Sequence, residues 1–382
     1  MNDTTHSKAA LPDGHKSVRV IISGGGTGGH VFPAIAIANA LKLADGNAEI
    51  LFVGAEGRME MEKVPAAGYR ILGLPVVGIQ RKLLSLRNLS VPLKLLRSMR
   101  RAAKIVSDFK PDVAVGVGGY ASAPILRVAQ KRGIPTLIQE QNSYAGLTNK
   151  LLAKRAKTVC VAYEGMERFF PERKLVFTGN PVRQDLENVA QLRNEALAHF
   201  GLTQGKQTVL VIGGSLGART VNMSVMRHIA DVVAAAGVQL LWQVGKHYEQ
   251  DVRQQLARYD CSNIKMLSFI QRMDYAYAAA DVVITRAGAA TISELCIVKK
   301  PCILVPSPNV AEDHQTANAM ALVQKNAAIL VHDDEAEATL IPTALRLVGD
   351  AKGRQALSRS IGKLAAADAA SRIAKEVIQL TK

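Results

Sequence analysis

Two glycine-rich segments, about half the chain apart, combine the residue types that hold phosphate. Each follows an apolar run and precedes a helical pattern. The first spans residues 24–30 and ends in His30, and the second spans residues 213–218 and contains Ser215. Unpaired backbone N–H groups at a helix start, with the positive end of the helix dipole behind them, bind phosphate. The repeated pattern predicts an enzyme of phosphorylated substrates with such a site in each of two domains.

His30 is our candidate for a general base. The sequence places it at the first turn of a predicted helix, where its imidazole would project into a cleft. An imidazole with a pKa near about 6.5 accepts a proton at neutral pH, and the helix dipole would lower that pKa and favour the neutral form. The alternative is a structural His30 that hydrogen-bonds the backbone of the turn.

The first segment also permits a dinucleotide interpretation. Gly24, Gly26 and Gly29 satisfy the Gly-x-Gly-x-x-Gly pattern, which would indicate a dinucleotide-dependent reductase. Such a site needs an acid at the end of the second strand to bind the ribose, and Glu56 lies a little beyond that position. The reductase is therefore the weaker interpretation.

A third glycine-rich turn, residues 116–119, follows another predicted strand in the first half. It gives that half a second candidate anion site, in which Gly118, Gly119 and Tyr120 would hold the diphosphate of an acceptor. The alternative is a tight strand-to-helix connection, where glycine is needed only for close packing. The sequence favours neither.

Polar residues after further predicted strands are candidates for binding a sugar or a ribose. Asn142 offers an amide to sugar hydroxyls, or it caps a helix. Glu294 can accept hydrogen bonds from a ribose diol, or it forms a capping box with Thr291. No Asp-x-Asp motif occurs in the sequence, so a metal-bridged diphosphate is not indicated and neither a metal nor a cofactor is predicted.

Short apolar runs alternate with helical patterns along the chain, which is typical of parallel strands buried on both faces. The predicted fold class is α/β, with two doubly wound Rossmann-like domains that face a cleft at the carboxyl ends of the strands. The expected strands are residues 18–23, 49–53, 113–117, 136–139, 158–161, 175–177, 208–212, 239–244, 264–269, 282–285, 302–305 and 328–331.

Breaks in this rhythm suggest the domain boundaries. Residues 1–17 are polar and are expected to be a disordered lead-in without a secretory signal. The pair Asn180 and Pro181 predicts a hinge, so the expected domains are residues 18–181 and residues 182–382. The last helix can pack back onto the first domain.

Composition narrows the class of partner. The chain of 382 residues carries a formal net charge of +16, which implies an anionic partner such as nucleic acid, a phosphorylated substrate or an acidic membrane surface. Aromatic residues make up only 4%, which argues against the aromatic platforms that bind single-stranded nucleic acid. The cysteines are scattered, with no spacing that indicates a metal or redox site.

A basic, leucine-rich segment at residues 81–101 departs from the α/β rhythm. It contains seven Lys or Arg residues and no acid. Such a segment can lie on an anionic bilayer, with its leucines in the acyl boundary and its cations on the head groups. The alternative, which the sequence alone favours slightly, is an amphipathic helix that packs on the sheet.

Taken together, these motifs resemble the MurG family, the bacterial peptidoglycan glycosyltransferases of glycosyltransferase family 28. The resemblance implies the GT-B fold and inverting transfer of N-acetylglucosamine from UDP-N-acetylglucosamine to the muramoyl 4-hydroxyl of undecaprenyl-diphospho-muramoyl-pentapeptide, at the cytoplasmic face of the membrane. The implied partners are therefore the nucleotide sugar, the acceptor lipid and an anionic membrane surface, without nucleic acid. The matching motifs lie at residues 25–34, 116–120, 140–142, 179–183, 213–215 and 286–294.

The resemblance also implies that residues 18–181 form an N-terminal acceptor and membrane-associated domain and that residues 182–382 form a C-terminal donor domain. It assigns donor-binding residues as well. Ile270 would meet the uracil and Glu294 the ribose. Members of the family often carry two adjacent glutamines where this chain has His314 and Gln315, which leaves Gln315 as the better candidate for the sugar. A UDP-N-acetylglucosamine 2-epimerase, which shares the fold and the donor, is the nearest alternative. The implied donor-binding residues are Thr27, Gly28, Gly29, Asn142, Arg183, Ser215, Ile270, Ala289, Ala290, Thr291, Ile292, Ser293, Glu294 and Gln315.

Overall fold

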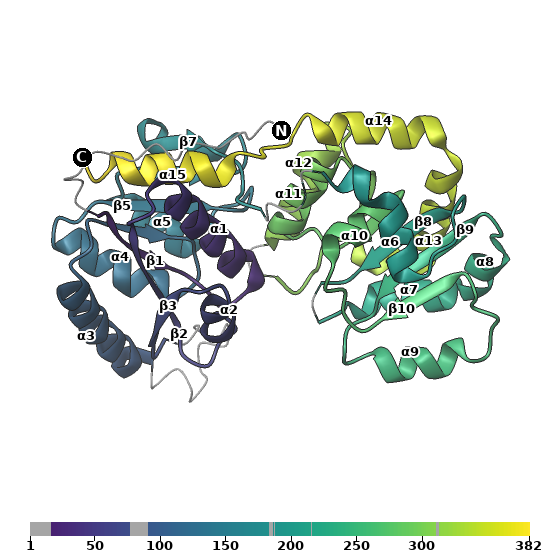
Figure 1. Ribbon diagram of the computed structural model, residues 1–382, viewed down its shortest axis with the longest axis horizontal. Helices are drawn as coiled ribbons and strands as arrows, with labels where there is room; N and C mark the ends of the chain where they lie inside the picture. The colour runs from purple at the N-terminus through teal and green to yellow at the C-terminus, as the bar shows by residue number, and fades with distance from the viewer. Residues whose placement is uncertain (1–16, 77–90, 183–185, 187, 215, 311–312) are drawn as a thin grey trace, which may run out of the picture.

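The chain folds into two α/β halves that lie side by side (Figure 1). This computed structural model describes residues 17–76, 91–182, 186, 188–214, 216–310 and 313–382. Each half is built on one parallel sheet with helices on both faces, which confirms the predicted doubly wound α/β class.

The N-terminal half contains a seven-stranded sheet in the order β3-β2-β1-β4-β5-β6-β7. Its strands are β1 (Arg19–Ser23), β2 (Glu49–Ala55), β3 (Arg70–Leu74), β4 (Val113–Gly116), β5 (Thr136–Glu140), β6 (Thr158–Val161) and β7 (Leu175–Phe177). Its helices are α1 (Gly28–Ala44), α2 (Glu60–Ala66), α3 (Val91–Phe109), α4 (Ser122–Lys131) and α5 (Leu147–Ala153), with short 3-10 turns η2 (Met166–Arg168) and η3 (Glu172–Lys174).

The C-terminal half contains a six-stranded sheet in the order β10-β9-β8-β11-β12-β13. Its strands are β8 (Gln207–Ile212), β9 (Val238–Gln243), β10 (Ile264–Leu267), β11 (Val282–Thr285), β12 (Cys302–Leu304) and β13 (Ile329–Leu330). Its helical elements are η5 (Val189–Leu192), α6 (Arg193–Phe200), α7 (Arg219–Arg227), α8 (Ile229–Ala234), α9 (Glu249–Leu256), α10 (Met273–Ala279), α11 (Ala289–Val298), α12 (His314–Val323), α13 (Asp333–Gly349) and α14 (Ala351–Gly362).

All the predicted strands are present, with ends that shift by a residue or two, but the sequence did not predict β3. This strand lies at the edge of the sheet, begins with an exposed Arg70 and contains Gly73. A short edge strand with glycine lacks the continuous β-branched run that marked the central strands.

The last helix crosses back to the first half. The segment after α14 leads to α15 (Ala369–Gln379), which lies against α1 at the top of the N-terminal half in Figure 1. Ile373, Ala374 and Val377 are buried in the same apolar cluster as Val20 and Ile37. Because these side chains complete the N-terminal core, the two halves are joined by packing as well as by the chain between β7 and η5.

Candidate active site

A cleft of about 700 Å3 lies between the two halves. The N-terminal half contributes Gly28, Gly29 and Phe32 from the start of α1. The C-terminal half contributes the segments that follow β8, β10, β11 and β12. The cleft therefore lies at the carboxyl ends of parallel strands, where open α/β sheets bind their ligands.

His30 lies in the first turn of α1, and one of its ring nitrogens is fixed by the glycine turn. Its Nδ1 is 3.1 Å from the carbonyl oxygen of Gly25 and 3.1 Å from Oγ1 of Thr27. Because a carbonyl oxygen only accepts, the contact with Gly25 assigns the proton to Nδ1 in the neutral ring. Nε2 is then the nitrogen that can take a proton.

The pKa of His30 is lowered, chiefly by burial. The nearby His314 lowers it further, whereas the hydrogen bond to Gly25 and the charge of Glu60 raise it. The direction is the one that the sequence predicted, but burial rather than the helix dipole is its main cause. The neutral imidazole is the form that can act as a base near neutral pH.

The third glycine-rich turn packs directly against the first. A Cβ atom on Gly119 would lie 2.4 Å from the carbonyl oxygen of Gly25, and one on Gly118, where φ is +93°, would lie 2.9 Å from Nε2 of His30. Glycine is therefore required here for close packing and for a left-handed backbone. The neighbouring Tyr120 is exposed.

The second glycine-rich segment follows β8 and forms the opposite wall of the cleft. Gln243 connects it to the loop after β10, because its Nε2 donates to Gly214 O at 2.9 Å and its Oε1 accepts from the N–H of Ile270 at 2.8 Å. Ile270 and Gln315 both line this cleft. One buried amide thus sets the spacing between two walls of the predicted donor site.

A cation is held in the same wall. Arg286 donates to Asp333 at the start of α13 and to the carbonyl oxygens of Val305 and Pro306. Thr220 donates to the other carboxylate oxygen of Asp333 at 3.1 Å. Arg286, Thr220 and Asp333 all border the cleft, so the guanidinium is fixed close to any anion that binds there.

Glu294 is positioned by a buried tyrosine. Its Oε2 accepts from the hydroxyl of Tyr277 at 2.9 Å, and both residues line the cleft. The capping-box alternative for Thr291 and Glu294 is wrong, because α11 begins at Ala289 with Gly288 as its N-cap. Both side chains lie inside the helix, so neither is used in a capping box and Glu294 faces the cleft instead.

Other predicted donor residues make contacts between the halves. Oδ1 of Asn142 accepts from Nδ2 of Asn318 at 3.2 Å, and Oγ of Ser293 accepts from Nδ2 of Asn180 at 3.0 Å. The capping alternative for Asn142 is wrong, since the next helix, α5, has Gly146 as its N-cap.

The remaining predicted residues fall into three groups. Gly28, Gly29, Ala290, Thr291 and Gln315 line the cleft, and Thr27 is the N-cap of α1. Ala289 and Ile292 are buried, and Ile292 belongs to the apolar core. Arg183 and Ser215 lie outside the described residues.

The cysteines are free thiols, and the described residues form no metal site. Among the residues that the structure describes, no group of His, Cys, Asp or Glu is arranged to hold a metal ion. Cys160, Cys296 and Cys302 are buried free thiols, and Cys261 is partly buried. Within the same described part of the chain, no helix has the length and apolar character needed to cross a bilayer.

Sequence reasoning missed several residues around the cleft. Tyr277 and Asp333 lie in no motif, and only the folded chain brings them to the site. Phe32 lies in the motif at residues 25–34, but no role was assigned to it. Glu60 is 1% exposed and hydrogen-bonds the first glycine turn. Its separation from that turn along the sequence hid the contact.

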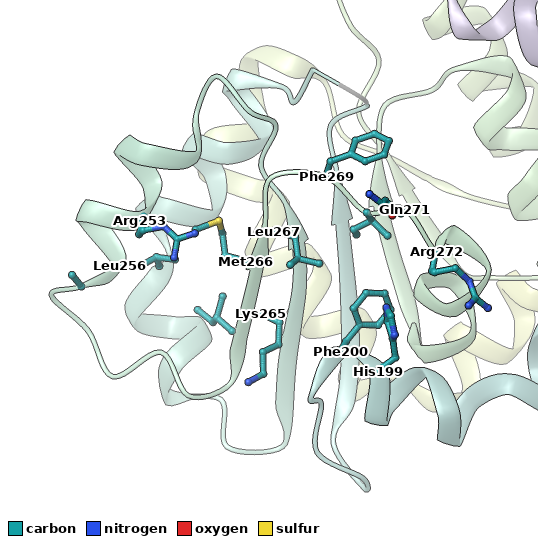
Figure 2. Close-up of a pocket in the computed structure, with 13 residues that line it drawn as sticks. His199, Phe200, Arg253, Leu256, Lys265, Met266, Leu267, Phe269, Gln271 and Arg272 are labelled. Carbon is teal, nitrogen blue, oxygen red and sulfur yellow. The ribbon is translucent and has the colours of Figure 1, made fainter. Parts of the chain in front are cut away.

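A further cavity of about 730 Å3 lies beside β10, at the outer edge of the C-terminal sheet (Figure 2). It shares Phe269, Ile270 and Gln271 with the cleft. Arg253 is paired with Glu249, and Arg272 is paired with Asp274. The two arginines of this cavity are therefore already paired with carboxylates, and Lys265 is a further cation in its lining.

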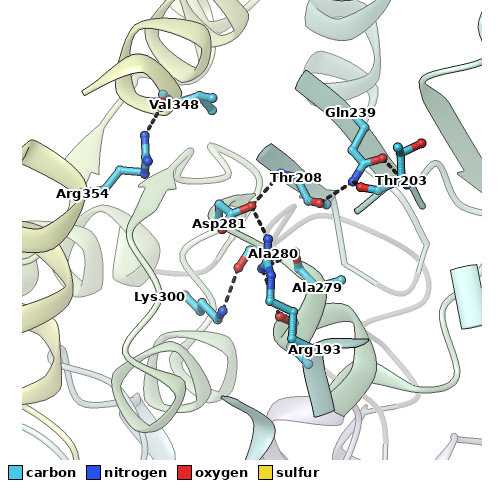
Figure 3. A network of polar contacts seen from close by, with 11 residues as sticks. Arg193, Thr203, Thr208, Gln239, Ala279, Ala280, Asp281, Lys300, Val348 and Arg354 are labelled. Atoms are coloured by element: carbon cyan, nitrogen blue, oxygen red, sulfur yellow. Dashed lines mark hydrogen bonds and ion pairs between the residues drawn. The ribbon is translucent and has the colours of Figure 1, made fainter. Parts of the chain in front are cut away.

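A polar network lies at the end of the C-terminal sheet that is farther from the cleft (Figure 3). Oδ2 of Asp281 accepts from the N–H of Thr208 at 2.7 Å and from Arg193 at 2.9 Å. Lys300 donates to Ala280 O at 2.7 Å, and burial lowers the pKa of this lysine to about 8. These contacts lie at the amino ends of β8 and β11, away from the cleft, so they support the fold.

The fold and the cleft define the class of protein: two facing Rossmann-like domains with a nucleotide-sized site between them are the GT-B architecture of glycosyltransferases. The chain belongs to glycosyltransferase family 28. The model of that family's N-terminal domain matches residues 20–161, and the model of its C-terminal domain matches residues 208–373. The resemblance to the MurG family is thereby confirmed.

Curated relatives match over nearly the full length. A protein of Parabacteroides distasonis is 58% identical over 96% of this chain and 99% of its own, and one of Bacteroides fragilis is 56% identical over 96% of each. Each is named "UDP-N-acetylglucosamine--N-acetylmuramyl-(pentapeptide) pyrophosphoryl-undecaprenol N-acetylglucosamine transferase".

Solved structures share the architecture. MurG of Acinetobacter baumannii superposes with a TM-score of 0.73 at 27% identity, over 95% of this chain and 99% of that one. UDP-GlcNAc 2-epimerase of Neisseria meningitidis gives a TM-score of 0.67 at 12% identity, over 95% of this chain and all of its own. The second likeness concerns the fold alone and gives no support to an epimerase activity.

Proposed function

We propose that this enzyme transfers N-acetylglucosamine from UDP-N-acetylglucosamine to the muramoyl sugar of undecaprenyl-diphospho-muramoyl-pentapeptide in peptidoglycan synthesis. The single observation that carries the proposal is one cleft between the halves. Its first wall is the start of α1, the helix that carries His30, and its second wall holds a phosphate-type turn, a fixed guanidinium and a carboxylate. Relatives at more than half identity carry a name that states the same transfer.

The reaction would proceed by in-line displacement with inversion. Nε2 of His30 takes the proton of the muramoyl 4-hydroxyl as its oxygen attacks C1 of N-acetylglucosamine, and the bond from C1 to the diphosphate of UDP breaks. Negative charge grows on the leaving diphosphate. The turn at Gly213 and the start of α7, with Ser215, provide N–H groups and a hydroxyl for that charge, and Arg286 adds a nearby cation.

On the donor side, each group has a chemical role that suits a nucleotide sugar. Ile270 would pack against the uracil, and Glu294 would accept hydrogen bonds from the ribose hydroxyls. Gln315 would bind the sugar, although its Oε1 also accepts from the N–H of Ser307 at 2.9 Å. Arg183 and Asn142 are further candidates from the family resemblance.

On the acceptor side, the turn at Gly118 and Gly119 would receive the lipid diphosphate close to His30. Tyr120 is exposed beside that turn and would contact the same acceptor. This arrangement would leave the 4-hydroxyl between the two walls of the cleft. Closure about Asn180 and Pro181 would then exclude water and limit hydrolysis of the donor.

We also propose that the N-terminal half binds an anionic membrane surface at the cytoplasmic face. Five residues of α3 are Lys or Arg and one is Asp, and Leu95 and Leu96 on this helix are exposed. Leu147 and Leu151 are exposed on α5, which covers the same face of the sheet as α3. Exposed leucines among cations are suited to an anionic lipid surface. Residues 81–90 of the predicted segment lie outside the described residues.

The test of the function is UDP release from UDP-N-acetylglucosamine in EDTA, with and without a lipid-diphosphate-linked muramoyl-pentapeptide analogue. We expect acceptor-dependent release and a product that is heavier by one N-acetylhexosamine in mass spectrometry. Acceptor-independent release of UDP would instead favour an epimerase. Inversion is read from the anomeric configuration of the new bond by NMR.

A further inference from the structure

A buried carboxylate lies behind the first glycine turn. Glu60 is the first residue of α2, and its side chain is 1% exposed. Its Oε1 accepts from the N–H of Ala55 at 2.9 Å, and its Oε2 accepts from the N–H of Gly26 at 3.0 Å. One of the N–H groups that the sequence assigned to phosphate binding is therefore already used by a carboxylate of the protein.

The bonded N–H belongs to the same peptide group that holds the imidazole. The carbonyl of Gly25 and the N–H of Gly26 form one planar peptide unit. Glu60 accepts from its N–H, and Nδ1 of His30 donates to its oxygen at 3.1 Å. A hydrogen bond to a carboxylate polarises a peptide group and makes its oxygen a stronger acceptor.

We propose that Glu60 is a positioning residue for His30, and that it acts through the peptide between Gly25 and Gly26. The carboxylate orients that peptide so that its carbonyl faces Nδ1, which selects the ring tautomer with the proton on Nδ1 and the free electron pair on Nε2. The carboxylate, the peptide and the imidazole form a relay. In this relay the peptide lies between the carboxylate and the ring, whereas in catalytic triads a carboxylate contacts the ring directly. No covalent bond is made or broken in the relay.

The packing of the turn fits this assignment. Gly25 has φ of +152°, and a Cβ atom there would lie 2.1 Å from Oε1 of Glu60, so the backbone approaches the carboxylate as closely as glycine allows. A Cβ atom on Gly54 would also lie 2.5 Å from Cγ of Glu60. The carboxylate is thus confined from both sides and has little freedom to leave the turn.

The groups that face His30 shift its pKa in opposite directions. Burial and His314, from the C-terminal half, lower its pKa, whereas the Gly25 hydrogen bond and the charge of Glu60 raise it. Thr27 Oγ1 and Gly118 are the neutral neighbours in the turns. Removing the charge of Glu60 should therefore lower the pKa of His30 further and weaken it as a base.

The decisive variant is Glu60→Gln, which keeps the size of the side chain but removes its charge. A glutamine in the same position replaces one acceptor oxygen by an NH2 group, which would set a donor against the N–H of either Ala55 or Gly26. We expect kcat to fall by about 10- to 100-fold, the loss that follows removal of the hydrogen-bond partner that orients a metal-ligating histidine. The KM for UDP-N-acetylglucosamine should stay unchanged, and the acid limb of the pH profile should move to lower pH.

The matched control is Glu62→Gln, on an exposed glutamate of the same helix that pairs with Lys63. It should leave kcat and the pH profile unchanged. A double variant with His30→Gln should be no slower than His30→Gln alone, because a residue that acts through His30 has nothing left to position. Additive losses would show that Glu60 acts on the fold and not on His30, and would overturn the proposal.

Long-range ¹H–¹⁵N NMR of the histidine ring tests the relay without relying on activity. The proposal rests on the proposed role of His30 as the base. If His30→Gln keeps wild-type kcat, that role is wrong. The ring spectrum of the wild type and of Glu60→Gln still shows whether Glu60 selects the tautomer of His30. The wild type should show a protonated Nδ1, and Glu60→Gln should show a mixture of tautomers and a lower pKa. An unchanged ring would overturn the proposal.

A second measurement covers the case in which Glu60→Gln does not fold. In the wild type, labelled with ¹⁵N-glycine, the Gly26 amide proton should resonate downfield and exchange slowly with solvent, because it is bonded to a buried carboxylate. A Gly26 amide that exchanges as fast as an exposed loop amide would contradict the contact on which the relay depends.

Discussion

The side chain of Asn318 in the C-terminal half is hydrogen-bonded to Asn142 in the N-terminal half. Nδ2 of Asn318 donates to Oδ1 of Asn142 at 3.2 Å, and Oδ1 of Asn318 accepts from the N–H of Ser143 at 2.9 Å. Asn318 is fully buried, and its Nδ2 is also 3.4 Å from Ala287 O. A single buried amide therefore connects the loop after β5 with the start of the donor segment.

Replacing this amide should loosen the contact between the halves. In Asn318→Ala the N–H of Ser143 loses its acceptor, which costs about 1–3 kcal/mol for a buried donor. We expect a lower Tm and a higher KM for the donor, because Asn142, a predicted donor residue, is no longer held by Asn318. Thermal unfolding and initial rates measure the two effects. The control is Gln324→Ala, an exposed position at the end of the same helix; equal Tm values for the two variants would contradict the role of Asn318.

Loss of the imidazole should affect the chemical step. His30→Gln keeps an amide that can bond Gly25 O but cannot take a proton. We expect kcat to fall by about 10²- to 10⁴-fold, the usual contribution of a general base, with little change in the KM for UDP-N-acetylglucosamine. Steady-state kinetics at saturating acceptor measures this. A variant with near-wild-type kcat would remove His30 from the role of base.

The same residue sets the expected pH dependence. A base is active when it is unprotonated, so kcat/KM for the acceptor rises with pH through the pKa of His30. Because burial lowers that pKa, the acid limb should lie below about pH 6.5, the value of a solvent-exposed histidine. A pH–rate profile measures the limb, and His30→Gln should abolish it. An acid limb above that pH in the wild type would contradict the environment described for His30.

The hydroxyl of Tyr277 should support donor binding through Glu294. Tyr277→Phe removes a hydrogen bond that orients the carboxylate, which is worth about 0.5–1.5 kcal/mol. We expect the KM for UDP-N-acetylglucosamine to rise by up to about tenfold, with kcat nearly unchanged. Tyr275→Phe is the matched control, since Tyr275 lies on the same helix and donates to Glu195 outside the cleft. The same KM for both variants would argue against a positioning role for Tyr277.

Much of the fold and part of the site follow from local sequence patterns. Continuous apolar runs predicted the central strands because those strands are buried on both faces, and the glycine turns predicted where their ligand-binding ends lie. His30 is our candidate base because it adjoins such a turn. The edge strand Arg70–Leu74 lacked the apolar run that marks a buried strand.

The residues that sequence reasoning missed depend on contacts distant in the chain. Glu60 is 34 residues from Gly26, and Asn318 is 176 residues from Asn142. A single buried carboxylate or amide carries no pattern that distinguishes it from other polar residues. For the same reason Ser293, read as a donor ligand, could not be recognised as a partner of Asn180.

The exposed leucines of α3 should contribute to lipid binding. A double variant, Leu95→Ser and Leu96→Ser, removes apolar area worth about 1.5–3 kcal/mol for each leucine that enters the acyl boundary fully. We expect binding to vesicles that contain anionic lipid to weaken at least tenfold, as measured by co-sedimentation. Turnover of a soluble acceptor analogue should be unchanged, because α3 does not line the cleft among the described residues.

High salt and a control leucine variant distinguish specific vesicle binding by α3 from nonspecific adsorption. High salt should weaken the vesicle binding of the wild type, because it screens the cations of α3 from the lipid head groups. Leu43→Ser, at an exposed leucine near the end of α1, should bind vesicles as the wild type does. If the α3 variant also binds as tightly as the wild type, this helix does not meet the membrane, and its cations serve only as a solvated face.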